Sequence, residues 1–341
     1  MAPVISVLIT CYNLERYIGP AIESVLAQDI SEPFEVIVVD DCSEDGSAAI
    51  IKSYRNVRYF RTDSNSGVLI AMLDGIKRTS GELIFLLDGD DLWEPDKLAR
   101  SVEAFRSDPN CALTSHDLLF VDEANRQLAR ASRPEQVLSR LKPDERSSRM
   151  AEGILHHLDF VWLGSALGVH RRLADLQGFD SWARRLPDPA NTYQDWPLAF
   201  WAASLPGTTM AYVPQKLFRY RLHSANHSGD ARDARRAIRN LTRAKNTLEA
   251  TLDIAMRGGL PAKICKGLRS RALSYKYLID LYSKRQPAAL IGFIRALPDF
   301  LRRGEAAKET LRLAAIMLLG PDRFAELRAG SGRPNRLGDP E

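Results

Sequence analysis

Short apolar runs alternate with amphipathic segments along the first part of the chain. The β-branched runs 4–10 and 34–39 have the length and composition of buried strands, and each is followed by polar or acidic residues. Between them, residues 17–27 carry apolar side chains at helical spacing. The pattern therefore predicts a strand, a helix and a second strand, the unit that builds parallel sheets.

The same alternation continues beyond residue 40. It predicts further helices over 47–54, 69–78 and 95–105 and further strands over 57–60, 83–87, 112–121 and 212–222. Right-handed crossovers between such strands give an open sheet with its ligand sites outside the carboxyl ends of the strands. We therefore predict an α/β fold with a Rossmann-like, mostly parallel sheet flanked by helices.

The second part of the chain has a different character. Residues 230–328 are helical in pattern and rich in basic residues, so we predict a C-terminal α-helical extension to a first domain spanning 1–229, with a disordered tail over 329–341. An apolar face over 290–301 is followed by Arg302 and Arg303. Packing of these helices on the first domain is the favoured interpretation, and contact with a membrane surface is the alternative.

Composition narrows the class of protein. The chain is 45% hydrophobic and 26% charged, as globular proteins are, and its net charge of +4 gives no indication of nucleic-acid binding. No stretch reaches about 18 uninterrupted apolar residues, and the amino terminus lacks the pattern of a signal peptide. Four cysteines without metal-ligand spacing favour reduced thiols, so we expect a cytoplasmic protein. They are Cys11, Cys42, Cys111 and Cys265.

Polar clusters follow three of the predicted strands, at 10–13, 40–41 and 88–91. In the last of these, carboxylates at Asp88, Asp90 and Asp91 repel one another, and a divalent cation is the usual remedy. Mg²⁺ or Mn²⁺ held in this way keeps open positions for phosphate oxygens, which predicts a diphosphate ligand. The alternative is a solvated acidic turn that caps the following helix.

The motifs SVLITCYN, VIVVDDCSEDGS, NSG and LLDGDDLW, in this order, resemble the family-2 glycosyltransferases of the A-type fold. The resemblance extends from residue 3 to about residue 228 and makes 1–229 a catalytic domain. It implies an inverting enzyme that moves a sugar from a nucleotide-diphosphate donor, with UDP the most expected nucleotide, to a hydroxyl of a glycan or lipid-linked acceptor. Polysaccharide or glycolipid synthesis at the inner face of the membrane is the expected setting.

The resemblance also assigns the nucleobase site. It implies that Thr10, Tyr12 and Asp41 hold the base, with Asn13 in the same strand-end motif. The chemistry agrees, because an aromatic ring can stack on a base and a carboxylate can accept a hydrogen bond from a ring N–H.

The metal and phosphate contacts follow from the same resemblance. Asp88 is expected to face the ribose and first phosphate, and Asp90 to bind the metal, with Asp91 as a further candidate ligand. In the segment YRLHSANHS, His223 is expected to reach the metal or diphosphate, and Arg221 a phosphate. Met72 and Leu73 stand where many relatives carry Arg-Asn, which puts a phosphate contact from that helix in doubt.

The resemblance makes Asp195 the catalytic base, which takes the proton of the acceptor hydroxyl. A helix N-cap is the structural alternative for this residue. Gln194 stands in place of the usual glutamate, which leaves the role of that position open. Gly164 and Ser165 lie where relatives place a small-residue loop near the donor, since a small residue permits close backbone approach.

Other functions are less consistent with the sequence. A dehydrogenase would carry Gly-x-Gly-x-x-Gly after its first strand, and a nucleotidylyltransferase a glycine-rich basic loop, but the chain has Thr-Cys-Tyr-Asn there. The remaining rival is a non-catalytic protein that binds nucleotide sugars or organises a membrane-associated assembly of glycan enzymes. The joint presence of Asp90, Asp195 and His223 argues against it.

Overall fold

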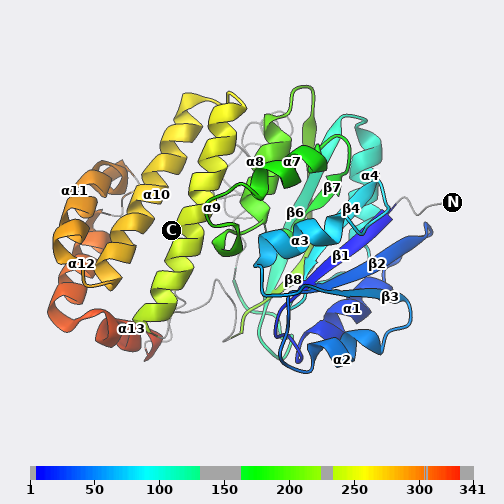
Figure 1. Cartoon of the computed structure of the whole chain (residues 1–341), viewed down its shortest axis with the longest axis horizontal. Coiled ribbons are helices and arrows are strands. Elements are labelled where there is room, and N and C mark those ends of the chain that lie inside the picture. Colours follow the sequence, from blue (N-terminus) through cyan, green and yellow to red (C-terminus); the bar gives the residue numbers. More distant parts are fainter. Residues whose placement is uncertain (1–4, 131–162, 224–232, 303, 305, 331–341) are drawn as a thin grey trace. The chain divides into compact units, whose positions relative to one another are not determined.

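The structure is a computed structural model that describes residues 5–130, 163–223, 233–302, 304 and 306–330 (Figure 1). The chain divides into two compact units, 1–222 and 223–341. This division lies seven residues before the domain boundary that the sequence predicts at 229, and residues 224–232 lie outside the described ranges. Of the predicted tail, only 329 and 330 are described, where they end a helix.

One mixed sheet organises the first unit, with the strand order β3-β2-β1-β4-β7-β6-β8-β5. Its first four strands are all parallel, as predicted, whereas β7 is antiparallel to both of its neighbours. The strands are β1 (Ile5–Cys11), β2 (Phe34–Asp40), β3 (Val57–Arg61), β4 (Leu83–Asp88), β5 (Leu92–Trp93), β6 (Cys111–Val121), β7 (Gly168–His170) and β8 (Thr209–Arg221).

Helices cover both faces of this sheet (Figure 1). The reason is that side chains alternate between the two faces along β1. Val7 and Ile9 join the core beneath α1, while Leu8 packs against α3 on the other face. The packing there is close, since a Cβ added to Gly75 of α3 would lie 2.4 Å from the Leu8 side chain. The helical elements of this unit are α1 (Ile18–Leu26), α2 (Ser47–Lys52), α3 (Val68–Ile76), α4 (Lys97–Ser107), η1 (Gly164–Ala166), α7 (Leu176–Ala183), η2 (Pro189–Asn191) and α8 (Asp195–Ser204).

The register of the central strands fixes where the polar clusters meet. Thr10 of β1 pairs with Asp88 of β4, and Cys11 pairs with Asp40 of β2. Since these strands are parallel, the residues that follow them leave the same edge of the sheet. The clusters 10–13, 40–41 and 88–91 are therefore neighbours in space.

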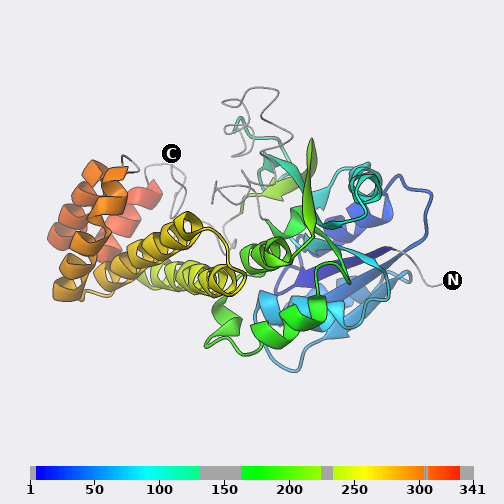
Figure 2. The ribbon, with the colours of Figure 1, turned by 90° about the horizontal axis from the view of Figure 1, so that it is seen from above.

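The second unit is entirely helical in its described residues. Figure 2 shows its two long helices, α9 and α10, running side by side, with three shorter ones beside them. None of the helices in the described ranges is long and apolar enough to cross a membrane. Their bounds are α9 (Ala234–Arg257), α10 (Ala262–Tyr282), α11 (Gln286–Arg302), α12 (Ala306–Leu319) and α13 (Pro321–Gly330).

Candidate active site

The carboxylate of Asp41 is held on both oxygens by the loop between β3 and α3. Its Oδ1 accepts hydrogen bonds from the backbone N–H of Ser66 at 2.8 Å and from the hydroxyl of Thr62 at 3.0 Å, and its Oδ2 accepts from the N–H of Gly67 at 2.8 Å. Gly67 has a φ of +83°, which favours glycine. These loop residues had no predicted role, although the NSG motif contains two of them.

Asn13 ties the end of β1 to the loop after β2. Its backbone N–H donates to the hydroxyl of Ser43 at 2.9 Å, and its side-chain Oδ1 accepts from the N–H of Glu44 at 2.8 Å. Asn13 itself has a φ of +54°, a conformation that asparagine tolerates better than most residues. Beside it, Tyr12 is half-buried. The structure thus brings Tyr12 and Asn13 to the same corner as Asp41, whose own N–H donates to Cys11.

Asp88 lies at the centre of the site. Its Oδ1 accepts from the hydroxyl of Thr10 at 3.2 Å and from the side-chain amide of Gln194 at 3.1 Å. Thr10, predicted to contact the nucleobase, therefore also orients Asp88. Gln194, whose role the sequence left open, is buried and links the end of β4 to the start of α8.

Gly164 makes this arrangement possible. A Cβ added there would lie 2.6 Å from Nε2 of Gln194 and 3.1 Å from Oδ2 of Asp88, which is closer than real Cβ contacts allow at the first of these atoms. Only a glycine lets the backbone approach the two side chains so closely. The close approach seen here is to protein side chains, and the predicted position of this loop near the donor stays a prediction.

Asp91 and Ser165 form a buried pair beneath the site. The Ser165 hydroxyl donates to Oδ2 of Asp91 at 2.6 Å and accepts from the N–H of Asp88 at 3.1 Å. Oδ1 of Asp91 accepts from the backbone N–H of Arg221 at 3.0 Å. Burial, together with the charges of Asp90 and Asp88, raises the pKa of Asp91 well above its ordinary value. Each oxygen of Asp91 thus already has a protein donor.

Arg221 supports the acidic loop from below. Its Nε donates to the backbone carbonyl of Asp90 at 2.8 Å, and its guanidinium lies 5.2 Å from the centre of the Tyr17 ring. Arg221 is almost fully buried, whereas Asp90 is partly exposed. The arginine therefore fixes the backbone that presents the Asp90 side chain, and its predicted phosphate contact stays a prediction.

Asp195 is the first residue of α8 and is partly exposed. Its Oδ1 accepts from the N–H of Trp196 at 2.8 Å. The N-cap alternative for Asp195 is wrong, because Gln194 occupies the N-cap position and makes no side-chain capping hydrogen bond. Burial of the carboxyl group raises the pKa of Asp195 to about 7. Burial and the negative charges of Asp90 and Asp195 raise the pKa of Asp88 to about 7 as well. Three carboxyl groups thus share one desolvated, electrostatically coupled site.

The metal-ligating side chains of this site suit a cation that takes most of its ligands from water and substrate. Across the described ranges, no three His, Cys, Asp or Glu side chains are grouped closely enough to hold a metal by themselves. Mg²⁺ and Mn²⁺ sites often use one or two carboxylates and complete the shell with water and phosphate oxygens. Asp90 fits this pattern. His223, the other predicted ligand, is buried and begins the second unit, and its role stays a prediction.

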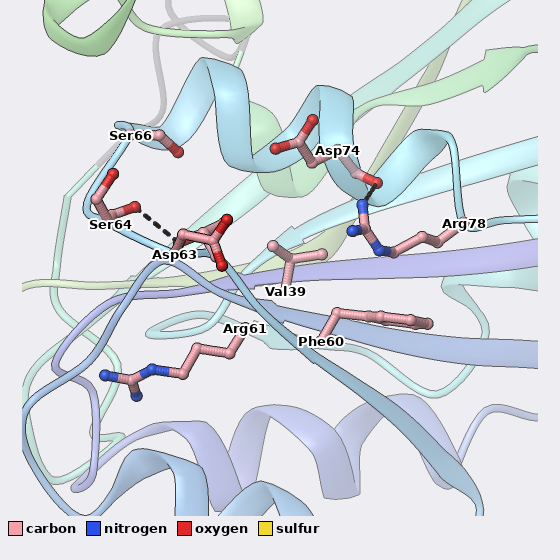
Figure 3. Close-up of a pocket in the computed structure, with 9 residues that line it drawn as sticks. Val39, Phe60, Arg61, Asp63, Ser64, Ser66, Asp74 and Arg78 are labelled. Atoms are coloured by element: carbon pink, nitrogen blue, oxygen red, sulfur yellow. Dashed lines mark hydrogen bonds between the residues drawn. The ribbon is translucent and has the colours of Figure 1, made fainter.

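A pocket of about 250 Å³ opens beside Asp41, between the end of β3 and α3 (Figure 3). Thr62 and Ser66 line it and also bond to Asp41, so it adjoins the predicted nucleobase corner. In Figure 3, the guanidinium of Arg78 points to Asp74, whose carbonyl it contacts at 2.6 Å. The other lining residues are Val39, Phe60, Arg61, Asp63 and Ser64.

Comparison with known sequences gives a consistent result. A profile described as Glycosyl transferase family 2 matches residues 6–163. The putative teichuronic acid biosynthesis glycosyltransferase TuaG of Bacillus subtilis is 35% identical over 127 residues, which are 35% of this chain and 49% of that protein. The succinoglycan biosynthesis protein ExoO of Rhizobium meliloti is 36% identical over 123 residues, or 35% of each chain. The matches thus span about half the length of these relatives or less.

Solved structures share the fold over nearly the whole chain. TarS residues 1–349 of S. aureus, in complex with UDP-GlcNAc, match with a TM-score of 0.52 at 15% identity, over 98% of this chain and 93% of that one. A mannosyltransferase from Pyrobaculum calidifontis, in complex with GDP-Man and Mn²⁺, matches with a TM-score of 0.54 at 20% identity, over 97% and 85%. Both are similar in architecture, which confirms the predicted fold class.

Proposed function

Residues 6–163 match the model of glycosyl transferase family 2, and from that match we propose that the chain is a glycosyltransferase of this family. In this proposal it transfers a sugar from a nucleotide-diphosphate donor, with UDP the favoured nucleotide, to an acceptor hydroxyl with inversion at the anomeric carbon. The observation that carries the proposal is the convergence of Asp88, Asp90 and Asp195 at one edge of the sheet. Three coupled carboxyl groups are costly without a cationic or proton-accepting role.

In this proposal, Asp90 holds a divalent cation, Mg²⁺ or Mn²⁺, together with oxygens of the donor diphosphate. Such an ion neutralises the charge on the departing nucleoside diphosphate. Asp88 faces the ribose and the first phosphate, held in place by Thr10 and Gln194. Asp91, predicted as a further ligand, fits better as the residue that positions the loop, since both of its oxygens accept protein hydrogen bonds.

Asp195 is the proposed catalytic base. Its carboxylate takes the proton from the acceptor hydroxyl while that oxygen bonds to the anomeric carbon and the bond to the nucleoside diphosphate breaks. A single displacement of this kind inverts the configuration. A pKa of about 7 suits the task, because a base works best when its pKa lies near the working pH.

The nucleobase is proposed to lie at the corner of Thr10, Tyr12, Asn13 and Asp41. The half-buried ring of Tyr12 offers a face for stacking. Asp41 is rigidly held by four hydrogen bonds to its carboxylate. A fixed carboxylate can discriminate between bases, because it accepts a hydrogen bond only from a base that places a ring N–H opposite it.

The acceptor is proposed to be a glycan or a lipid-linked saccharide in cell-surface polysaccharide or glycolipid synthesis. Relatives named for teichuronic acid and succinoglycan biosynthesis support this setting. Residues 126–150 form a polar segment of the kind that often contacts an acceptor, and they lie outside the described residues from 131 onward. A cytoplasmic enzyme in peripheral contact with the inner face of the membrane completes the proposal.

Two measurements test the function. A panel of nucleotide sugars is screened for thermal stabilisation of the chain with Mn²⁺ and with EDTA, and a UDP-sugar is expected to raise the melting temperature only when the metal is present. Transfer by the best donor is then compared between the wild type and Asp195→Asn. The rival proposal of a non-catalytic binding protein predicts donor binding with no turnover in either protein, which would refute the catalytic assignment.

A further inference from the structure

The exposed surface of α11 is mostly apolar. Ala289, Ala296 and Phe300 face the core of the second unit. Arg295 is exposed on the remaining surface of the helix, and so are six apolar residues that follow helical spacing. They are Pro287, Leu290, Ile291, Ile294, Pro298 and Leu301, with Ile294 60% and Leu301 63% exposed.

The next helix, α12, buries Leu313 and Ile316 in the core of the second unit but also exposes large apolar side chains. Glu309 and Arg312 are buried and form an ion pair, with N–O distances of 2.9 and 3.2 Å. Leu311 is 71% exposed and Leu318 is 85% exposed. A helix in water normally turns charges outward and leucines inward. The buried ion pair and the exposed leucines together favour an apolar environment at the outer face of α12.

These two faces belong to neighbouring helices, α11 and α12 (Figures 1 and 2). We define the apolar surface as the exposed side chains Leu290, Ile291, Ile294, Leu301, Leu311, Met317 and Leu318. Large apolar side chains exposed on two neighbouring helices are a feature of interaction sites.

Charge distinguishes between the possible occupants. The second unit, 223–341, contains 23 lysines and arginines and 12 acidic residues, while the first unit has an excess of acidic residues. On α10, exposed basic side chains recur at helical spacing at Lys263, Lys266, Arg269 and Lys276. Two such units would repel each other in a dimer, whereas an anionic lipid surface attracts each of them.

We propose that α11 and α12 lie in the plane of an anionic membrane, with the apolar surface inserted at the boundary between headgroups and acyl chains. Basic side chains, such as the exposed Arg295 on α11, would contact the lipid phosphates. The helices lie on the membrane and do not cross it, in keeping with the lack of a spanning helix among the described residues. The proposal requires no donor, metal or acceptor, and so it stands apart from the catalytic assignment.

The test is partition of the full chain onto vesicles without donor or metal. Vesicles of phosphatidylglycerol and phosphatidylcholine in a 3:7 ratio are compared with pure phosphatidylcholine at low salt. We expect at least about tenfold stronger binding to the anionic vesicles, weakening as salt is added. Equal or absent binding to both vesicle types would overturn the proposal.

Matched variants locate the surface. The double variant Ile294→Glu, Leu318→Glu should reduce binding to anionic vesicles by about tenfold or more. Both side chains are exposed in the protein, and insertion into the lipid would bury the new carboxylates, which opposes binding. Met256→Glu, at a residue 57% exposed near the end of α9, should leave binding unchanged. Circular dichroism checks that each variant is folded, and Asp195→Asn should bind as the wild type does.

The competing occupant is a second copy of the chain. Sedimentation equilibrium without lipid should give a monomer for the wild type. If the wild type is a dimer and does not bind vesicles, and if the Ile294→Glu, Leu318→Glu variant is a monomer, the apolar surface is a dimer interface and not a lipid-binding surface. A wild-type protein that fails to bind anionic vesicles but still transfers sugar to a water-soluble acceptor would refute the membrane proposal alone.

Discussion

The side-chain amide of Gln194 donates to Oδ1 of Asp88 across 3.1 Å and joins the end of β4 to the start of α8. The two residues are separated by 106 positions in the chain. Because Asp195 follows Gln194 directly, this bond fixes the distance between the proposed base and the proposed donor site. A residue that departs from the pattern of the relatives thus has a defined structural task.

Replacement of Gln194 tests that task. Gln194→Ala removes one donor to a carboxylate, and we expect transfer kcat/KM to fall by about 10- to 150-fold, in line with the roughly 1.5–3 kcal/mol of a hydrogen bond to a charged group. Gln194→Glu adds a fourth carboxyl group and should cost more. Steady-state kinetics with a saturating metal measure both. Wild-type values in the alanine variant would rule out a positioning role.

The pH profile tests Asp195. The base works in its deprotonated form, and its pKa is raised to about 7, so kcat/KM should rise with pH up to about 7 and level off above it. Below that point the rate should fall by about tenfold per pH unit. Asp195→Asn should retain donor binding by calorimetry, lose about 10²–10⁴ in kcat and lack this acidic limb. A flat wild-type profile between about pH 5.5 and 8 would contradict the assignment.

Gly164→Ala tests the close packing at the site. The new methyl group would lie 2.6 Å from the amide nitrogen of Gln194, so Gln194 and Asp88 must move. Overpacking of this kind costs about 1–3 kcal/mol, and we expect a drop of about tenfold or more in kcat/KM. Gly19→Ala is the matched control. Its Cβ would be 3.4 Å from the nearest atom, in a helix where alanine is favoured, so unchanged activity is expected there.

Lys97 offers a test of stability away from the site. It is fully buried, its Nζ has no hydrogen-bond partner among the described residues, and it lies 3.7 Å from the centre of the Trp93 ring. Burial lowers the pKa of this amine well below its ordinary value. Lys97→Met keeps the length of the side chain and removes the desolvated amine. We expect the variant to be more stable than the wild type at pH 7, by about 1–3 kcal/mol in urea unfolding.

The sign of its pH dependence follows from proton linkage. The unfolded state binds a proton at Lys97 up to about pH 10.4, whereas the folded state favours the neutral amine, so the stability of the wild type rises with pH in this window. The advantage of Lys97→Met should therefore shrink as the pH rises from 7 to 9. An advantage that stays constant with pH would show that the buried amine is not the cause.

The sequence predicted most of the first unit because its elements are locally encoded. Apolar runs such as β1 and β2 can only be buried strands, and the helices between them carry their own periodicity. The antiparallel β7 was missed, since three residues carry too little pattern to be distinguished from a loop. Its pairing with β4 and β6 depends on partners far away in the chain.

The sequence by itself determined the alternating fold, the order of the acidic clusters and the resemblance that points to Asp90 and Asp195. Only the tertiary structure decided which side chains hold these groups: Gln194 and Thr10 on Asp88, Ser165 on Asp91, and the 62–67 loop on Asp41. The reason is physical. Strand and helix periodicity is written in neighbouring residues, whereas hydrogen bonds and raised pKa values arise from residues that meet only when the sheet has formed.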